Sequence, residues 1–556
     1  MTSNRHDDPA QPLGVRMILT YSARRIASNP FQIPNVIDKF KSNFPKAVWR
    51  RQVNILRSYL SIGSPFDSLV TNFETRDTRA LSGLLAAHRF SNRRKIPQRS
   101  EDAWTQHAID LSHTLFDWAE GKIEFSDQVM VPGLPGDNHN GPVSRILLVA
   151  HSDPRQNWNG YAIRTHEIAK ALIGHDLEVA VVTKPRLNLN EAAIAQDETI
   201  DGVHYYALDP LGMDDISVDR YLTKYCDGVS RVIDMYQPHI VHSGSNFLTG
   251  LAGGIAGKRH RLPTLYEMRG RWELTRLVTH KGYRKSPGFK AQTNMESFVS
   301  TRSDFVLALN GQLRDMIIDA GVNADAVGIL PNCGMSGGPI GNENVSPEEI
   351  APPLFKNGGD DAEFCTFGYI GSLVDYEGLF LLLDAFEALC KSRGDIRLMV
   401  AGSGSLNAAI RTRMKQSAHS DNMKFLTRLS NTEARALHNA IDVIVIPRLP
   451  SDVTRLVTPI KPFTAFQSGV PCLMSDVQPL SEIAEQSQAA ILFKAGNGAD
   501  LRRKMNDIAD DKPLRESLGR SGRHWIRTER NWVKQTENLL EIYNQINAHY
   551  CDKSRR

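Results

Sequence analysis

The sequence predicts an α/β protein built from two doubly wound, Rossmann-like domains, with a helical extension at the N-terminus. Two runs of alternating buried strands and amphipathic helices carry this prediction, because alternation at this spacing is typical of parallel sheets. With 556 residues, the chain is long enough for more than one domain. We expect an extension and linker at 1–140, a first domain at 141–345, a second domain at 346–530 and a terminal helix at 531–556.

Apolar runs of strand length precede helical patterns in both domains. The strands predicted for the first domain are ILLVAHSD, EVAVVTK, VHYYAL, HIVHSGS, TLYEMRG, FVLALN and VGILPN. Those predicted for the second domain are FGYIGSLV, IRLMVAGSG, MKFLTRL, IDVIVIPR, PCLMSD and AAILFK. Open parallel sheets bind ligands beyond the carboxyl ends of their strands, so the residues directly after each strand are the candidates for binding.

The N-terminal extension has a helical pattern from about residue 15 to 125 and an excess of positive charge. Nine Lys or Arg residues lie between positions 16 and 57, against Asp38 alone, and five more lie between positions 89 and 99. Basic residues mixed with aromatic and aliphatic ones are typical of an interfacial helix, so residues 13–100 are a candidate surface for an anionic membrane. The alternative is a solvated helical cap whose aromatic residues pack on the first domain.

The overall composition excludes several classes of protein. The net charge is only +4, so we expect no nucleic-acid partner. The six cysteines are scattered without a CxxC pair, which predicts reduced thiols and neither a disulfide framework nor a zinc site. The N-terminus has no apolar signal region, and no apolar run approaches the ~18 residues of a membrane span. We therefore expect a cytoplasmic location, either free or peripheral on the inner face of the membrane.

Common cofactor motifs are absent as well. No GxGxxG fingerprint follows ILLVAHSD, which argues against NAD binding. GGIAGKRH fails as a P-loop, because the required spacing places Ala252 and Arg259 where a glycine and a Ser or Thr are needed. No HExxH motif or cluster of carboxylates marks a metal site. We expect no cofactor and no metal.

The stretch at 447–476 has features of a phosphate site. It is predicted to end a strand, pass through a loop, form a short helix and enter a buried strand. Thr458 is the expected N-cap and Pro459 the first helical residue. A helix start with Arg455 just before it and Lys461 in its first turn is a place where a phosphate anion settles. The alternative is that both residues are ordinary solvated charges.

The chain from about residue 145 to 546 resembles the retaining glycosyltransferases of family 4, which have the GT-B fold. The resemblance rests on NGYAIRTH, YEMRGRWE, GYIGSLVDYEG and VTPIKPFTAFQSGVP, which occur in the order found in that family. It implies a nucleotide-diphosphate sugar held mainly by the second domain and a glycan or lipid-linked acceptor held mainly by the first. It also implies that the terminal helix crosses back to the first domain.

The resemblance further implies roles for individual residues. Arg455 and Lys461 would hold the donor diphosphate and stabilise the leaving group, and Glu267 and Arg269 would face the transferred sugar or the acceptor. Further donor contacts would come from Gly160, Tyr161, Gly371, Ser372, Thr427, Arg428, Leu429, Thr458, Pro459 and Thr464. Acceptor contacts would come from Asn159, Arg164 and His242. Retention without an evident nucleophile implies attack on the leaving-group face, with the departing phosphate taking the acceptor proton and no metal required.

The chain departs from the family pattern at four positions. Leu456 and Thr464 stand where many members have two glutamates. Ser372 and Glu377 stand where many members have Arg and Lys. The second of the two glutamates usually contacts the ribose, so Thr464 predicts weak or unusual nucleotide binding. Two alternatives therefore stay open: a degenerate transferase acting as a binding subunit of a polysaccharide-assembly complex, and a nucleotide-sugar epimerase.

Overall fold

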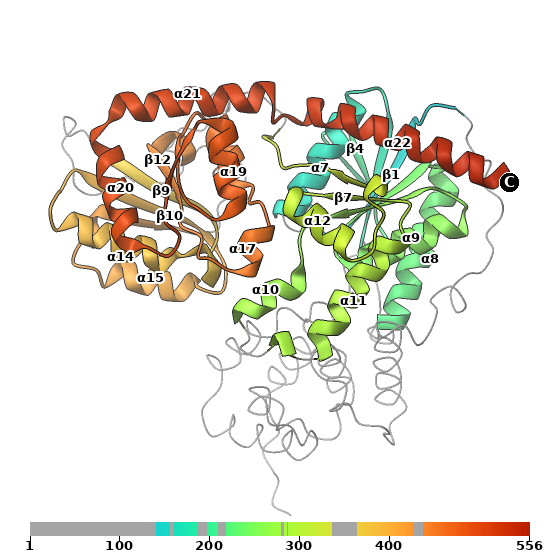
Figure 1. The fold of residues 1–556 in the computed structure, drawn as a ribbon, viewed down its shortest axis with the longest axis horizontal. Helices are drawn as coiled ribbons and strands as arrows, with labels where there is room; N and C mark the ends of the chain where they lie inside the picture. The colour runs from blue at the N-terminus through green and yellow to red at the C-terminus, as the bar shows by residue number, and fades with distance from the viewer. Residues whose placement is uncertain are drawn as a thin grey trace, which may run out of the picture.

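The computed structural model describes residues 141–155, 159–185, 197–209, 218–279, 283–285, 287–335, 364–427, 433 and 437–555. These residues form two α/β domains that lie side by side, and the last two helices run along one edge of both (Figure 1). The predicted helical extension, including its candidate membrane surface at 13–100, lies outside the described residues.

The first domain contains a sheet of eight strands in the order β3-β4-β2-β1-β5-β6-β7-β8. They are β1 (Arg145–Ala150), β2 (Glu178–Thr183), β3 (Glu198–Ile200), β4 (Val203–Tyr206), β5 (Ile240–Gly244), β6 (Thr264–Met268), β7 (Phe305–Ala308) and β8 (Val327–Ile329). All neighbouring pairs in this described sheet are parallel except β3 and β4. The chain runs outwards from β1 through β2 and returns to β5 on the other side of β1, which places a ligand crevice at the carboxyl ends of β1 and β5.

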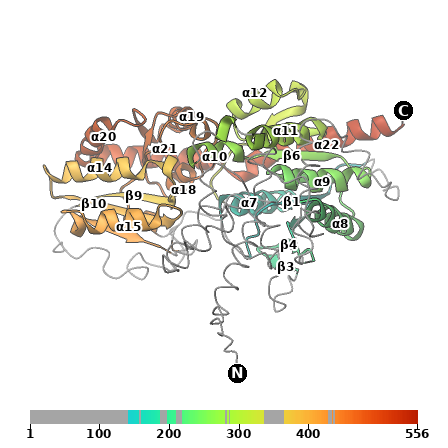
Figure 2. The same cartoon turned by 90° about the horizontal axis from the view of Figure 1, so that it is seen from below.

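Helices cover both faces of this sheet (Figure 2). They are α7 (Gly160–Ile173), α8 (Val218–Tyr236), α9 (Phe247–Arg259), α10 (Trp272–Thr279), α11 (Pro287–Arg302) and α12 (Gly311–Asp319). Val229 of α8, Phe247 of α9 and Leu313 of α12 belong to one apolar cluster. Ile168 of α7 and Tyr543 of the C-terminal helix belong to another. The two clusters separate the sheet from solvent on its two faces.

The second domain contains an all-parallel sheet of six described strands in the order β11-β10-β9-β12-β13-β14. They are β9 (Cys365–Ser372), β10 (Ile396–Ser403), β11 (Met423–Leu426), β12 (Val443–Ile446), β13 (Cys472–Ser475) and β14 (Ala490–Phe493). The helices are α14 (Leu379–Cys390), α15 (Asn407–Lys415), α17 (Asp452–Leu456), α18 (Lys461–Gln467), α19 (Gln478–Ser487), α20 (Gly498–Asp510) and α21 (Lys512–Thr528). Side chains of α14, α15 and α20 form one apolar cluster, and those of α18, α19 and α21 form another. This sheet reverses its order between β9 and β12, so its crevice opens there.

The last helix, α22 (Trp532–Arg555), returns to the first domain (Figure 1). Trp532, Leu539 and Tyr543 pack into the apolar cluster beneath α7. Near the start of the domain, the backbone N–H of Val143 donates to Asn544 Oδ1 at 3.0 Å. The chain therefore ties its end to the domain in which its described part begins.

The predicted phosphate-binding stretch differs from the prediction in its local structure. A short helix, α17, forms first, because Ser451 and Thr454 make a capping box. The next helix, α18, has Ile460 as its N-cap residue, and Thr458 lies in the segment between the two helices. The Thr458 hydroxyl accepts a hydrogen bond from Asn310 of the first domain at 2.9 Å. The predictions of Thr458 as N-cap and Pro459 as the first helical residue are wrong, because the helix begins at Lys461, and the Thr458 hydroxyl makes a contact between the domains instead.

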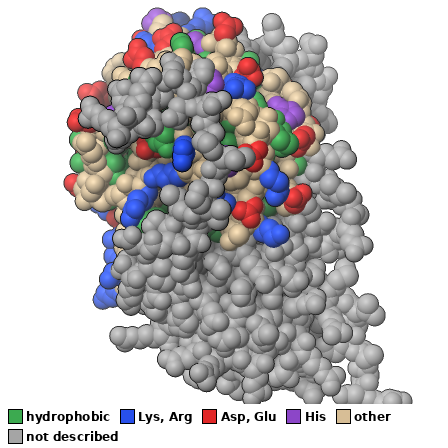
Figure 3. Space-filling model, turned by 90° about the vertical axis from the view of Figure 1, so that its right-hand side faces the viewer, with side chains coloured by type: hydrophobic (Ala, Val, Ile, Leu, Met, Phe, Trp, Pro, Cys, Tyr) green, Lys and Arg blue, Asp and Glu red, His purple; other side chains and the backbone are tan. Residues whose placement is uncertain are grey.

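On the face shown in Figure 3, Lys and Arg side chains lie among Asp and Glu side chains, with hydrophobic side chains scattered between them. Within the described ranges, no helix is both long and apolar enough to cross a bilayer.

Candidate active site

A cavity of about 640 Å³ lies between the two domains. Its walls contain residues that directly follow strands of both sheets, where ligands bind in open parallel sheets. The first-domain wall includes His151, Ser152, Asn159, Gly160, Tyr161, Arg164, Arg269 and Trp272. The second-domain wall includes Gly371, Ser372, Glu377, Arg448, Thr458, Pro459, Lys461 and Thr464.

Two asparagines of the first domain hold the second domain at this cavity. Asn332 Nδ2 donates to the Thr458 carbonyl at 2.9 Å. Asn310 Nδ2 donates to Thr458 Oγ1 and to the Leu456 carbonyl, both at 2.9 Å. These bonds position Thr458 and Pro459, which line the cavity, relative to the first domain.

The start of α7 forms part of the first-domain wall. Asn159 caps this helix, since its Oδ1 accepts hydrogen bonds from the backbone N–H groups of Tyr161 and Ala162. A Cβ atom at position 160 would lie 3.2 Å from Ile460 Cδ1, so Gly160 allows the second domain to approach closely. Asn159, Gly160 and Tyr161 thus stand together at the meeting point of the two domains.

Neighbouring residues hold Tyr161 in place. Its hydroxyl accepts a hydrogen bond from Trp272 Nε1 at 2.8 Å, and its carbonyl accepts one from Arg269 Nη1 at 3.1 Å. Burial raises the pKa of Tyr161 to about 12. The phenol is therefore protonated at neutral pH, and its O–H can donate a hydrogen bond to a ligand.

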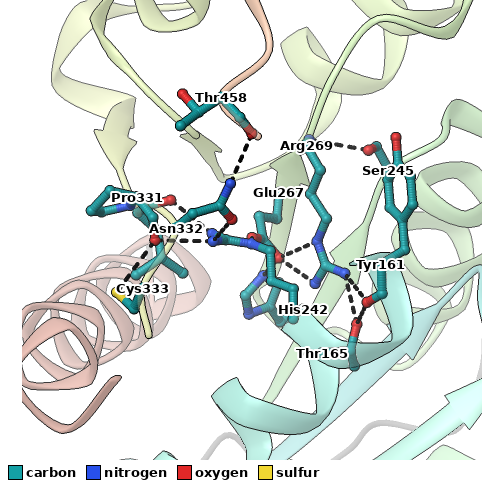
Figure 4. A network of polar contacts seen from close by, with 12 residues as sticks. Tyr161, Thr165, His242, Ser245, Glu267, Arg269, Pro331, Asn332, Cys333 and Thr458 are labelled. Carbon is teal, nitrogen blue, oxygen red and sulfur yellow. Dashed lines mark hydrogen bonds and ion pairs between the residues drawn. The ribbon is translucent and has the colours of Figure 1, made fainter. Parts of the chain in front are cut away.

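Glu267 lies behind the cavity wall, at the centre of a buried polar network (Figure 4). Arg164 Nε donates to Glu267 Oε1 at 2.5 Å, and Arg269 Nε donates to Oε2 at 2.8 Å. Burial alone would raise the pKa of Glu267, but the two guanidinium groups outweigh it and hold the pKa well below its usual range. Arg164 and Arg269 line the cavity, whereas Glu267 does not. We therefore correct the prediction that Glu267 touches the substrate: it positions the two arginines.

His242 is also a positioning residue. Its Nδ1 lies 2.7 Å from the hydroxyl of Tyr543, and its Nε2 lies 3.4 Å from Glu267 Oε2. Burial lowers the pKa of His242, so the imidazole is neutral at pH 7. Its side chain is covered on all sides and does not line the cavity. The predicted acceptor contact is wrong, because His242 lies within β5 and Tyr543 of α22 packs against its ring.

Three charged residues of the second domain form the opposite wall. Lys461 Nζ lies 2.9 Å from Glu377 Oε2, and Arg448 Nη2 donates to Glu377 Oε1 at 3.0 Å. Arg448 Nη1 also donates to the Val457 carbonyl at 2.7 Å. Burial alone would raise the pKa of Glu377, but the two cations hold it at about 2. One carboxylate balances two buried cations, so this wall carries a net positive charge toward the cavity.

Gly371 makes room for the lysine. Its φ of +152° lies in a region that side chains rarely adopt, and a Cβ atom there would lie 2.3 Å from Lys461 Cε. The residue after it, Ser372, lines the cavity as well. Glu377 stands at a position where many members of the family have a lysine. In this chain its carboxylate forms an ion pair with the Lys461 ammonium.

Arg455 does not reach this cavity. It lies in the last turn of α17 with 65% of its side chain exposed, and it pairs with Asp452. It faces a separate cavity of about 400 Å³, together with Leu274 and Leu277 of the first domain. We therefore correct the prediction that Arg455 holds the diphosphate. Arg448, which sequence reasoning missed, lines the cavity instead and shares Glu377 with Lys461, and its position just after β12 was the available signal.

The remaining predicted donor residues divide into three groups. Thr458, Pro459 and Thr464 line the cavity. Thr427 follows β11 and does not belong to the cavity wall. Arg428 and Leu429 lie outside the described residues. Across the part of the chain that the structure describes, no three His, Cys, Asp or Glu side chains are grouped so that they could hold a metal ion.

Both domains match glycosyltransferase families. Residues 159–333 match the family model of the glycosyl transferase 4-like domain, and residues 354–525 match that of glycosyl transferases group 1. The two matches fall on the two α/β domains in order. They support the assignment of the chain to the glycosyltransferases that combine a 4-like domain with a group 1 domain.

Known proteins and structures are similar to this chain. The capsular polysaccharide biosynthesis glycosyltransferase CapM of Staphylococcus aureus is 22% identical over 322 residues, which cover 55% of this chain and 77% of that protein. The sucrose-phosphate synthase structure from Thermosynechococcus elongatus has a TM-score of 0.57 at 16% identity and covers 73% of this chain and 100% of that one. The structure of WaaG, a glycosyltransferase involved in lipopolysaccharide biosynthesis, has a TM-score of 0.50 at 14% identity, with coverages of 72% and 99%. The predicted fold class, the GT-B arrangement of two facing domains, is confirmed.

Proposed function

We propose that this chain is a retaining glycosyltransferase that moves a sugar from a nucleotide-diphosphate sugar to a glycan or lipid-linked acceptor. The observation that carries the proposal is the pair of buried cations, Lys461 and Arg448, on one wall of a cavity between two glycosyltransferase-like domains. The similarity to a capsular polysaccharide glycosyltransferase supports an acceptor used in polysaccharide assembly.

On this proposal, the second-domain wall binds the donor. Lys461 and Arg448 donate charge-assisted hydrogen bonds to the diphosphate and stabilise the charge that grows on it as the sugar leaves. Glu377 orients both cations before the donor arrives. No metal or cofactor is required for this role, because the two cations supply the positive charge; the nucleotide-diphosphate sugar is a co-substrate.

The first-domain wall faces the donor and binds the acceptor. Asn159, Tyr161 and Trp272 offer hydrogen-bonding and aromatic groups there. In the transfer step, the bond between the anomeric carbon and the phosphate oxygen breaks as the acceptor oxygen bonds to the same face of that carbon. The acceptor proton passes to the departing phosphate oxygen. Attack from the leaving-group face retains the anomeric configuration.

Calorimetry with nucleoside diphosphates tests the donor site directly. The full-length chain is titrated with UDP, ADP, GDP and CDP, and the preferred nucleotide is then titrated into Lys461→Met. We expect about a tenfold or greater loss of affinity, because a contact between an ammonium and phosphate is lost. Lys415→Met, on the exposed end of α15, is the matched control and should bind like the wild type. Equal binding by wild type and Lys461→Met would contradict the proposed donor site.

A further inference from the structure

A second basic pair lies at the first-domain end of the cavity. Lys184 follows β2 and His151 follows β1, and these parallel strands pair in register at Ala150 and Thr183. Lys184 Nζ lies 3.0 Å from His151 Nε2. His151 and the next residue, Ser152, line the cavity, whereas Lys184 is not part of the cavity wall and reaches it through its contact with His151. None of the roles described so far uses this pair.

Lys184 differs from the other cations of the site in its charge balance. Arg164 and Arg269 share Glu267, and Lys461 shares Glu377 with Arg448. In the described part of the chain, no carboxylate is paired with Lys184. Burial lowers the pKa of Lys184 to about 8, so the ammonium form still predominates at neutral pH.

His151 cannot supply the missing negative charge. Burial and the neighbouring ammonium hold the pKa of His151 well below its usual range, so the ring is neutral. The ammonium of Lys184 donates to Nε2, which assigns the ring proton to Nδ1. Nδ1 faces Ser152 Oγ at 3.4 Å, and the same oxygen accepts a hydrogen bond from Asn159 Nδ2 at 3.2 Å.

The remaining hydrogen-bond donors of this group have a common chemistry. Two N–H bonds of the Lys184 ammonium are not used by His151, and the Ser152 hydroxyl retains its own proton to donate. A cluster of donors with one uncompensated positive charge suits a ligand that has several acceptor oxygens and a negative charge. A phosphate group has both.

An aromatic surface lies next to this cluster. The rings of His151 and Trp272 meet edge to face with centroids 4.7 Å apart, and Trp272 and Tyr161 meet at 5.7 Å. All three rings line the cavity. Aromatic side chains provide apolar contact area together with polar edges, which suits the mixed surface of a sugar ring.

We propose that His151 and Ser152 on the cavity wall, together with the Lys184 ammonium that contacts His151, form an anion subsite in the acceptor half of the cavity, and that the acceptor carries a phosphate group close to its sugar. This inference rests on the proposed function, because the first-domain wall is taken as the acceptor side. Two sources share the chemistry: a free sugar phosphate and a lipid-linked sugar diphosphate.

Calorimetry on the full-length chain tests the subsite, with the preferred nucleoside diphosphate present at saturation so that the donor cations are occupied. The probes are glucose 6-phosphate, geranyl diphosphate and, as the neutral partner, glucose. We expect one of the two phosphate probes to bind at least about tenfold more tightly than glucose, in keeping with a charge-assisted contact. A preference for glucose 6-phosphate indicates a sugar-phosphate acceptor, and one for geranyl diphosphate indicates a lipid-linked acceptor.

Variants assign the preference to Lys184. Lys184→Met should abolish it, and Lys184→Arg should restore most of it. Lys170→Met, which removes a lysine that pairs with Asp201 on the surface of the same domain, should leave it unchanged. Equal binding of all probes by the wild type, or an unchanged preference in Lys184→Met, overturns the inference.

Two further measurements keep this result independent of the donor site and of folding. If none of the four nucleoside diphosphates binds, the proposed donor site fails, and the same probes titrated into Lys461→Met still report on Lys184. In the wild type, the phosphate probe should slow acetylation of Lys184, read by mass spectrometry, at least about fivefold more than glucose does, as a charge-assisted contact implies. Equal acetylation rates with both probes contradict the subsite even if Lys184→Met does not fold.

Discussion

Arg448 and Arg455 provide a matched pair of substitutions. Both are arginines of the segment between β12 and α18, but only Arg448 lines the cavity. We expect Arg448→Met to lower turnover about a hundredfold, since removal of a preorganised donor to developing charge costs about 3 kcal/mol of barrier. Arg455→Met should change turnover less than about twofold, because its side chain is 65% exposed and its ion pair with Asp452 lies in water.

Stability must be separated from catalysis in this comparison. Arg448→Met removes one of the two cations on a buried carboxylate, Glu377, and we expect a loss of up to about 3 kcal/mol in the free energy of unfolding. Thermal unfolding of each variant measures this loss, and turnover is then measured well below the transition. Arg448→Lys keeps the charge but cannot donate two hydrogen bonds as the planar guanidinium does, so its turnover should lie between that of Arg448→Met and that of the wild type.

The assay is the initial rate of nucleoside diphosphate release from the preferred donor in the presence of an acceptor. The reasoning would be refuted if folded Arg448→Met kept wild-type turnover while Arg455→Met lost it. That result would support the original prediction that Arg455, and not Arg448, binds the diphosphate.

Four other expectations follow from the structure. Gly371→Ala should reduce turnover about as much as the loss of Lys461, because the new Cβ atom would lie 2.3 Å from Lys461 Cε and would displace the lysine. Near wild-type turnover in this variant would show that catalysis does not need the lysine in this position. Thr464→Glu should tighten nucleotide binding about tenfold in calorimetry, since a carboxylate on this wall could accept ribose hydroxyls; tight binding by the wild type without a gain in the variant would contradict this. Activity should survive EDTA, because Lys461 and Arg448 supply the positive charge, and a strict requirement for added Mg²⁺ or Mn²⁺ would refute that mechanism. Burial and the charge of Glu273 raise the pKa of Glu296 from 4.5 to about 7, so the folded state binds this proton more tightly than the unfolded state does. The free energy of unfolding should therefore fall as the pH rises from 4.5 through 7. In denaturant titrations, Glu296→Gln should make this fall less steep, and the same pH dependence in the variant and the wild type would contradict the expectation.

The fold was predictable because its signals are local. Apolar strands such as ILLVAHSD, and amphipathic helices such as α7, can each be recognised within a short window of sequence. Their alternation predicts parallel sheets, and the carboxyl-end rule then predicts the edge that binds ligands. These local signals, together with the family resemblance, led to a substantial part of the cavity wall, including Asn159, Gly371 and Lys461.

Contacts between distant segments caused the errors. His242 and Glu267 were expected just beyond their strands, but they lie within β5 and β6, and Tyr543 of α22, 301 residues beyond His242, contacts the His242 ring. The spacing of Arg455 suggested a phosphate contact, but α17 turns the side chain away from the cavity. Periodicity and spacing do not report which strand ends a later helix will bury.

Charge balance is also a property of the folded structure. In the sequence, Glu377 is an acidic residue at a position where many members of the family have a cation. The structure brings Lys461 and Arg448 to it from other segments, 84 and 71 residues along the chain. The missing positive charge at position 377 can therefore be supplied by residues that are distant in the sequence, and only the folded structure identifies them.

The central claim, sugar transfer from a nucleotide-diphosphate donor in the cavity between the domains, is tested most directly by a turnover screen. The full-length chain is incubated with a panel of nucleotide-diphosphate sugars, each with neutral, phosphorylated and lipid-linked acceptors, and both the released nucleotide and the product anomer are measured. The account predicts acceptor-dependent release of a nucleoside diphosphate from one donor, with a product of unchanged anomeric configuration and loss of the reaction in Lys461→Met. A product of inverted configuration, or full turnover in Lys461→Met, would contradict it.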